Sequence, residues 1–285
     1  MASPGGRPVG VPMASTGTLY LVDGTAQLFR AYFAIRGLTN DDGLPTNAVF
    51  GFTTMLRKLI QDEQPDHLAV AWDLAGPTFR HEQFAEYKAN RPDMPEDLGV
   101  QFPHAKQVCE VFGIPCLEKA GFEADDLIAT FVDRARERGY DVVVVASDKD
   151  LLQLVGEGVV NLNPSKDLRL DAEGVREHFG VPPDRVIDVL GLMGDAVDNI
   201  PGVPGVGEKT AKAMISTYGP MEKVLDRADR FVAAFDARDA AVGAIEAADR
   251  ADPLGDDALR ALDDRLVEFS AAVRALVELE RDEEF

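Results

Sequence analysis

The sequence is poor in cysteine, histidine and tryptophan, and it contains no long apolar run. Among 285 residues there are 2 cysteines, 4 histidines and 1 tryptophan. Two cysteines give no disulfide framework, and we interpret Cys109 and Cys116 as small buried residues of a protein in a reducing, cytoplasmic compartment. The histidines are scattered, so no His/Cys set has the spacing of a zinc site. No stretch of about 20 apolar residues is present, so we expect no membrane span.

Positive charge is also scarce. The chain has 29 Lys and Arg against 50 Asp and Glu, a formal net charge of −21. Taken alone, this balance argues against a nucleic-acid partner, because phosphate binding is driven by Lys and Arg. Net charge is a sum, however, and much of the acid lies after residue 221. Carboxylates that hold metal ions also count as negative, although bound ions would offset them.

Three short apolar runs, at 19–22, 68–72 and 142–146, predict buried parallel strands. Between them, residues 48–60 and 124–138 have apolar side chains at helical spacing. This alternation of strands and helices predicts an α/β fold with a mainly parallel sheet flanked by helices. The first 17 residues, rich in Gly, Pro and Ser, are expected to be a disordered tail.

The remaining segments are less regular. Residues 79–92 are polar and end at Pro92, which is typical of an exposed loop or a surface helix. After residue 183 the chain is expected to be helical again, interrupted by a glycine-rich loop at 202–207, with a new helix from Glu208. From Met221 onward we expect helix without a motif that carries chemistry.

Each predicted strand leads into an aspartate. Asp23 follows the first strand, Asp73 the second and Asp148 the third. Any one of them, taken singly, is more typical of a turn or a helix cap. Because parallel strands end at the same edge of a sheet, the three carboxylates are expected to lie along one edge, where sites form.

Six more acids occur in short clusters that could join this edge. They are Glu123, Asp125, Asp126, Asp150, Asp195 and Asp198. Carboxylates packed together would repel one another or become protonated unless cations are present. Hard, oxygen-preferring ions such as Mg²⁺ or Mn²⁺ resolve that repulsion. Two such ions can activate a water and stabilise the leaving oxygen of a phosphodiester, so the cluster predicts two-metal phosphodiester hydrolysis.

The glycine-rich loop predicts a close approach of backbone to a ligand. Gly202, Gly205 and Gly207 precede Lys209 and Thr210 at the start of a helix. Backbone N–H groups at a helix N-terminus suit a phosphate, and such contacts position a duplex without reading its sequence. The loop by itself is more often a structural turn, and its position directly after Asp195 and Asp198 favours the binding role.

Six ordered motifs together resemble the 5′→3′ exonuclease (flap endonuclease) domain of bacterial DNA polymerase I. The motifs are LVDG (21–24), FRHE (79–82), YKANRP (87–92), EADD (123–126), SDKDLLQL (147–154) and GDAVDNIPGVPGVGEKTA (194–211). The resemblance covers residues 18–220. It implies a PIN-like nuclease domain over 18–180 with a helical arch over 77–98. It also implies a helical C-terminal region over 181–285, with a helix–three-turn–helix motif at 184–218.

The resemblance also implies functional roles. The nine acids would hold two Mg²⁺ or Mn²⁺ ions, and Asp23, Asp73 and Asp148 would act in catalysis together with Lys88 and Arg91. Arg80, Tyr87, Lys88 and Arg91 would contact DNA in the arch, as would the glycine-rich loop with Lys209 and Thr210. K⁺ would bind at that loop. The expected substrates are 5′-flap, nicked or primer–template duplexes and RNA primers, and the enzyme would act as a monomer in replication and repair.

Two departures from the family pattern shape the expectations. No polymerase sequence follows Phe285, so we expect a free-standing form with a separate DNA polymerase as candidate partner. After Tyr218 the sequence drifts from the family pattern, although all nine acidic positions are occupied. Two alternatives stay open, a non-catalytic DNA-junction-binding protein and a PIN-type ribonuclease. The complete acidic set disfavours the first, and the glycine-rich loop disfavours the second.

Overall fold

A six-stranded sheet is the centre of the fold, and β1 lies in its middle. The computed structural model describes residues 15–228. The sheet order is β3-β2-β1-β4-β5-β6, parallel except for the antiparallel pair β5 and β6. The strands are β1 (Thr18–Asp23), β2 (His67–Ala71), β3 (Cys116–Leu117), β4 (Asp141–Val145), β5 (Val159–Asn163) and β6 (Leu168–Leu170). The three predicted strands are confirmed as the central trio β2, β1 and β4.

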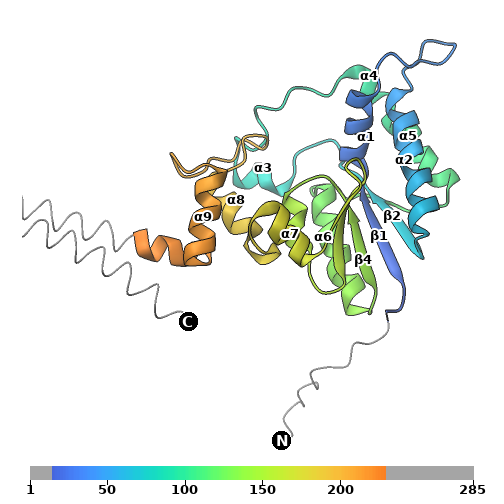
Figure 1. Ribbon diagram of the computed structural model, residues 1–285. Helices are drawn as coiled ribbons and strands as arrows, with labels where there is room; N and C mark the ends of the chain where they lie inside the picture. The colour runs from blue at the N-terminus through green and yellow to red at the C-terminus, as the bar shows by residue number, and fades with distance from the viewer. Residues whose placement is uncertain (1–14, 229–285) are drawn as a thin grey trace, which may run out of the picture. The chain divides into compact units, whose positions relative to one another are not determined.

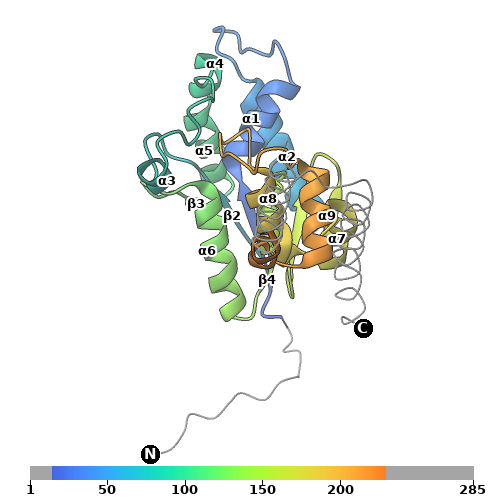
Figure 2. The ribbon, with the colours of Figure 1, turned by 90° about the vertical axis from the view of Figure 1, so that its left-hand side faces the viewer.

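Both faces of the sheet are covered by helices, as expected for a parallel sheet made of nearly continuous apolar runs (Figures 1 and 2). Successive side chains of β1 alternate between the faces. Tyr20 and Val22 join the core beneath α1, α2 and α5, whereas Leu21 packs with α6 on the opposite face. Two separate cores therefore fix β1, and with it the position of the residue that follows Val22.

The helices agree with the predicted periodicity. They are α1 (Gly24–Ala34), α2 (Asn47–Glu63), α3 (Phe79–Gln83), α4 (Glu96–Gly99), α5 (Phe102–Val111), α6 (Ala124–Glu137), α7 (Ala172–Phe179), α8 (Val186–Met193) and α9 (Glu208–Tyr218). Two 3-10 helices, η1 (Asp150–Leu154) and η2 (Pro183–Arg185), connect them. Acidic caps begin three of the described helices, and those of α1 and α6 belong to the predicted acidic set. The Asp23 carboxylate accepts from the Ala26 N–H at the start of α1, and Glu123 and Asp126 form a capping box at α6.

Helices α7, α8 and α9 share a third core, which lies beside the end of η1. Val186, Val189 and Leu190 of α8 are buried in it, as their helical spacing predicts. A further helix begins at residue 221 and is described as far as residue 228. Tertiary contacts divide the chain after Val224.

The segment at 77–98, expected to be a helical arch, is helical only near its two ends, in α3 and α4. Between them the chain forms turns, and Lys88 adopts a left-handed backbone conformation with φ of 57°. A left-handed residue interrupts an α-helix, and Pro92 and Pro95 cannot continue one. The extent of helix expected here is therefore corrected to these two short helices.

Two expectations fall wholly or partly outside the described residues. Of the expected tail over 1–17, residues 1–14 lie outside them, whereas Thr16 donates its N–H to the Gly139 carbonyl at 2.9 Å. The expected helices beyond residue 228 also lie outside them. In the part that the structure does describe, no helix is both long and apolar enough to cross a membrane.

Candidate active site

The three strand-end aspartates lie on three neighbouring strands, β2, β1 and β4. Asp23 is the last residue of β1, and Asp73 and Asp148 follow shortly after β2 and β4. A cavity of about 180 Å³ opens between them and α6. Its acidic lining residues are Asp23, Asp73, Glu123, Asp125 and Asp148. Sequence positions more than a hundred residues apart thus meet at one edge of the sheet.

Several of these acids also have the local role that a single aspartate usually has. The Ala26 N–H donates to Asp23 Oδ1 at 2.9 Å, and the Ala124 N–H donates to Asp73 Oδ1 at 2.8 Å. The Asp150 N–H donates to Asp148 Oδ1 at 3.0 Å. Each of these bonds engages one carboxylate oxygen and fixes the orientation of the side chain. The backbone hydrogen bond thus holds the carboxylate at the cavity.

Four acids that line the cavity, Asp23, Asp73, Asp125 and Asp148, form no ion pair with any described residue, and we call them the inner acids. Burial and the neighbouring charges of Asp73 and Asp148 raise the pKa of Asp23 to about 7. Burial, followed by the charges of Asp23 and Asp148, raises the pKa of Asp125 to about 8. The inner acids therefore concentrate more negative charge than the surrounding protein stabilises.

Three other acids, Asp126, Asp195 and Asp198, are paired with basic side chains, and we call them the outer acids. Arg80 forms two bonds of 2.8 Å to the two carboxylate oxygens of Asp126. Lys149 Nζ lies 3.1 Å from Asp195 Oδ2, and Arg91 pairs with Asp198 Oδ1. Burial alone would raise the pKa values of Asp126 and Asp195, but their hydrogen bonds outweigh it and lower both.

The two remaining acids lie between these sets. Lys88 Nζ lies 2.8 Å from Glu123 Oε1, so this cavity-lining acid is already paired. Burial, together with the charges of Asp148 and Asp195, raises the pKa of Asp150 to about 6. Oδ1 of Asp150 is buried and has no hydrogen-bond partner.

The donor chemistry of the inner acids fits a hard divalent cation, because it consists of carboxylate oxygens whose charge is not compensated. The present side-chain arrangement is not a ready coordination sphere. Among the described residues, no three His, Cys, Asp or Glu side chains are grouped so as to hold a metal ion. Part of the reason is that the outer acids and Glu123 form ion pairs, in which basic groups occupy carboxylate oxygens that a metal ion would need.

Residues 84–91 and 194–200 lie against one another beside the cavity. Tyr87 is buried, and its hydroxyl lies 3.0 Å from both Glu123 Oε2 and Asp198 Oδ2, so its single proton is donated to one of the two carboxylates. The Lys88 N–H donates to the Asp198 carbonyl at 2.9 Å. Lys88 and Arg91 line the same cavity as the inner acids. Of the residues expected to contact DNA here, Lys88 and Arg91 face the cavity, whereas Tyr87 joins the two segments from within.

The residues of the glycine-rich loop do not line the cavity, and glycine occupies its three positions for different structural reasons. A Cβ on Gly202 would lie 2.3 Å from the Met193 carbonyl group, so two backbones meet there. Gly205 has φ of 79°, whereas Gly207 precedes α9 with open space around it. Lys209 and Thr210 are exposed in the first turn of α9. None of these residues lines the acidic cavity.

Three residues beside the site were not identified from the sequence. Lys149 pairs with Asp195, and Asn90 and Asn199 tie the two segments together through side-chain amides. The position of Lys149 between Asp148 and Asp150 is a usable signal. Asn199 has φ of 57°, a conformation that asparagine tolerates better than most residues, but its partner Glu86 cannot be read from local sequence.

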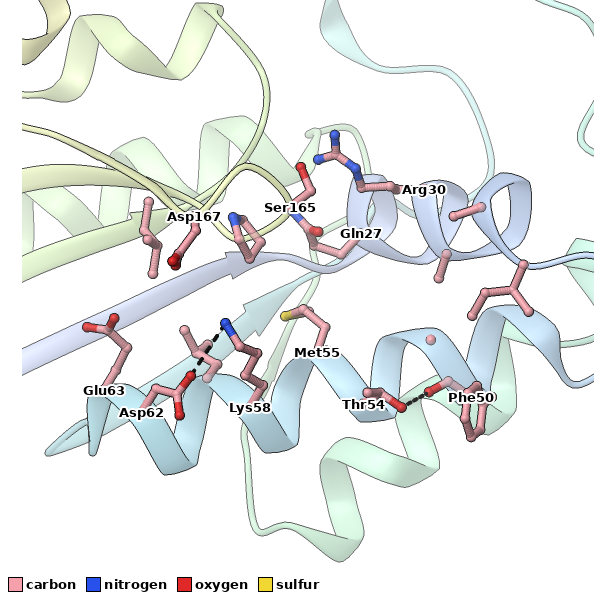
Figure 3. Close-up of a pocket in the computed structure, with 17 residues that line it drawn as sticks. Gln27, Arg30, Phe50, Thr54, Met55, Lys58, Asp62, Glu63, Ser165 and Asp167 are labelled. Atoms are coloured by element: carbon pink, nitrogen blue, oxygen red, sulfur yellow. Dashed lines mark hydrogen bonds and ion pairs between the residues drawn. The ribbon is translucent and has the colours of Figure 1, made fainter.

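A larger cavity, of about 470 Å³, lies between α1, α2 and the turn after β5 (Figure 3). Its walls are mostly apolar, and the buried amide Nε2 of Gln27 has no hydrogen-bond partner. Arg30, at its edge, donates to the Ser147 hydroxyl next to Asp148. None of the predicted site residues lines this cavity, so the acidic cavity is marked by its chemistry and not by its size.

The sequence matches two family models in succession. Residues 18–180 match the family described as 5′-3′ exonuclease, N-terminal resolvase-like domain. Residues 181–254 match the family described as 5′-3′ exonuclease, C-terminal SAM fold.

Among its relatives, a 5′-3′ exonuclease of Aquifex aeolicus is 43% identical over 214 residues, which is 75% of this chain and 74% of that protein. DNA polymerase I of Bacillus caldotenax is 43% identical over 220 residues, covering 74% of this chain and 24% of the polymerase. DNA polymerase I of Pseudomonas aeruginosa is 47% identical over 211 residues, covering 74% and 23%. The chain thus spans about a quarter of the length of these polymerases.

Two solved structures of a bacteriophage T5 enzyme are similar in fold. The T5 5′-exonuclease with bound divalent zinc has a TM-score of 0.61 at 26% identity, covering 74% of this chain and 79% of that one. The T5 flap endonuclease in a complex with DNA and metal ions also has a TM-score of 0.61 at 26% identity, covering 73% and 78%. The catalytic core of Rad2, at 20% identity and a TM-score of 0.53 over 82% of this chain and 70% of that one, shares the fold.

Proposed function

Since the chain belongs to the 5′-3′ exonuclease family, we propose that it is a structure-specific 5′ nuclease that hydrolyses phosphodiester bonds in DNA. The observation that carries the proposal is one cavity that holds both signs of charge. The inner acids lie at the strand ends, and Lys88 and Arg91 reach the same cavity from residues 84–91. Uncompensated carboxylates suit divalent cations, and basic side chains beside them suit a phosphate.

The proposed cofactor is a pair of Mg²⁺ or Mn²⁺ ions. Asp23, Asp73, Asp125, Asp148 and Glu123 would provide inner ligands, and Asp126, Asp150, Asp195 and Asp198 would provide ligands directly or through water. When bound, such ions activate the attacking water and stabilise the leaving oxygen. The T5 relatives were solved with divalent metal ions, which supports a cation at this edge.

The protein's own groups would orient and neutralise the substrate. Lys88 and Arg91 would leave their carboxylate partners and bind the nonbridging oxygens of the scissile phosphate, where negative charge increases in the transition state. Because these side chains already lie in the cavity, little reorganisation is required. Backbone hydrogen bonds at the starts of α1 and α6 hold the carboxylates of Asp23 and Asp73 at the cavity.

The proposed substrate is a duplex with a free 5′ end, such as a 5′-flap, a nick or an RNA primer annealed to DNA. The loop from Gly202 to Gly207 and the first turn of α9 would hold the duplex backbone, because Gly207 leaves open space at a helix N-terminus. Residues 77–98 would pass the 5′ strand. We also propose K⁺ binding at this loop, and a monomer that acts in the cytoplasm beside a separate DNA polymerase.

A cleavage assay tests the proposal directly. The purified chain should cleave a 5′-flap duplex near the junction when Mg²⁺ or Mn²⁺ is added, and EDTA should stop the reaction. Asp148→Ala should abolish cleavage while the protein still binds the flap. Undiminished cleavage by this variant would overturn the assignment. Binding without cleavage by the unmodified chain would favour a junction-binding protein, and cleavage of single-stranded RNA alone would favour a ribonuclease.

A further inference from the structure

Two asparagines connect residues 84–91 to residues 194–200 from opposite sides. Asn90 Nδ2 donates to the Ala196 carbonyl at 2.8 Å, and Asn199 Nδ2 donates to the Glu86 carbonyl at 2.7 Å. Each amide therefore crosses to the main chain of the other segment. Because both acceptors are backbone carbonyls, the two bonds fix the relative position of the two main chains and not merely of two side chains.

Lys88 lies in the sequence between the two residues that form these hydrogen bonds on its own segment, Glu86 and Asn90, and its backbone conformation needs support from its surroundings. Its φ is 57°, a left-handed value that is uncommon for lysine, and its N–H donates to the Asp198 carbonyl at 2.9 Å. Such conformations persist only where surrounding contacts over-determine them. Tyr87 is the buried side chain of this stretch, whereas Glu86, Ala89 and Asn90 are exposed. The hydrogen bonds to residues 196–199 therefore add to the packing of Tyr87 in supporting Lys88.

The backbone of Lys88 decides where its ammonium group lies. In the present position Nζ is 2.8 Å from Glu123 Oε1 and 3.8 Å from Asp198 Oδ2, at the wall of the acidic cavity. A lysine side chain has many rotamers, so an anchored backbone is what limits the volume that its charge explores. Arg91 depends on the same segment, because its Nε lies 3.4 Å from the Val197 carbonyl.

We propose that Asn90 and Asn199 are positioning residues that hold Lys88 and Arg91 at the cavity for the reaction. This inference rests on the proposed nuclease function. The asparagines act through the backbone of residues 86–91 and have no contact with the reacting phosphate. They should therefore contribute to turnover, which needs the charge in place, and little to duplex binding, which depends on the glycine-rich loop.

The test uses the full chain and variants that separate the amide from the backbone. Asn199→Gly removes the amide donor but tolerates the left-handed backbone, and Asn199→Asp keeps the shape without the donor. Asn90→Ala and Asn90→Asp repeat the comparison for the hydrogen bond from Asn90 to the Ala196 carbonyl. Gln107→Ala is the matched control, because it removes an exposed amide contact with His104 on α5, away from both segments.

With a 5′-flap substrate, each donor-less variant should lower kcat roughly five- to tenfold, the effect of losing one hydrogen bond, while KM stays within about twofold. Hydrogen exchange of the Lys88 amide should become faster, and Gln107→Ala should change neither quantity. In a Lys88→Met background, Asn199→Gly should lower kcat less than it does in the wild-type chain, because only its effect on Arg91 remains.

Three results would overturn the proposal. They are unchanged kcat in both donor-less series, a loss expressed only in KM, and full additivity of Asn199→Gly with Lys88→Met. A wild-type chain that cleaves no DNA would instead refute the proposed function. In that case hydrogen exchange of the Lys88 amide still tests whether the two asparagines anchor its backbone. Unchanged exchange in Asn199→Gly and Asn90→Ala would exclude the positioning role.

Discussion

Asp23 and Asp195 are both aspartates beside the same cavity, yet their surroundings have opposite effects on their charge. Burial and like charges raise the pKa of Asp23 to about 7, whereas hydrogen bonds from the Val197 backbone and Lys149 keep the pKa of Asp195 low. Among the described residues the inner acids form no ion pair, whereas each outer acid already has one. The difference teaches that one acidic cluster contains two kinds of site. The inner part keeps acids with raised pKa values, and the outer part is partly neutralised by direct ion pairs within the chain.

The largest expected effect comes from removing one inner charge. Asp23→Asn keeps the acceptor oxygen for the Ala26 N–H and removes the carboxylate. We expect cleavage of a 5′-flap to fall by roughly 10³-fold or more, because the variant loses a proposed metal ligand that the outer acids cannot replace. Steady-state kinetics with saturating Mg²⁺ measures the effect. If activity falls less than tenfold, the inner acids are not the cation site.

The same variant should be more stable than the wild-type chain when divalent ions are absent. A carboxyl whose folded pKa is raised above its unfolded value of 3.8 stabilises the fold only while it is protonated. In EDTA the free energy of unfolding should therefore fall as pH rises from about 4 to about 8. Asn removes that slope at position 23, giving a gain of about 1–3 kcal/mol at pH 8. Urea titrations at several pH values test this, and an equal slope in both proteins would contradict it.

Breaking an outer pair should have a smaller effect of opposite sign. Arg80→Ala leaves Asp126 without its two-bond partner, and we expect a loss of about 1 kcal/mol, because Arg80 is partly exposed and the pair is screened by solvent. Arg80→Lys should recover the charge but not the second bond, and so part of the stability. Thermal unfolding compares the three proteins. A stabilising Arg80→Ala would show that the outer acids need no protein counter-charge.

The smallest expected effect is on the salt dependence of DNA binding. Arg80 and Lys149 are engaged with the outer acids, and Lys212 pairs with Glu208, so these three basic groups are less available to the duplex. The slope of log K against log salt should then be shallower than about −4. Lys209→Ala should reduce its magnitude by about 1, while Arg80→Ala should leave it nearly unchanged. Fluorescence anisotropy across a salt series distinguishes the two.

The sequence predicts the sheet and the inner acids well, for a physical reason. Parallel strands buried on both faces are long apolar runs, and their ends must meet at one edge, so Asp23, Asp73 and Asp148 could be placed without coordinates. The alternative interpretation of a single aspartate as a helix cap also holds for Asp23, which caps α1 while it lines the cavity. One carboxylate has two oxygens, and the two roles do not compete.

The outer part could not be predicted in the same way, because its contacts are non-local and lack periodicity. Residues 79–92 have no apolar face, so nothing in them indicates that Tyr87 is buried. Its hydroxyl partner Asp198 lies 111 positions away. The left-handed backbone of Lys88, which interrupts the expected helix, likewise depends on the carbonyl of Asp198 and not on its sequence neighbours.

The order of strands in the sheet has a consequence for biosynthesis. Among the described strands β1 comes first in the sequence, but its two neighbours in the sheet are β2 and β4, and β4 ends only at Val145. A nascent chain shorter than this can pair β1 with β2 on one side, but it leaves the other side of β1 unpaired and lacks the third strand-end aspartate. The α1–α2 pair can form early from local contacts, whereas the sheet must await a long-range pairing. The three strand-end aspartates can therefore come together only after residue 148 has been synthesised, and a shorter fragment would leave the β4-facing edge of β1 uncovered.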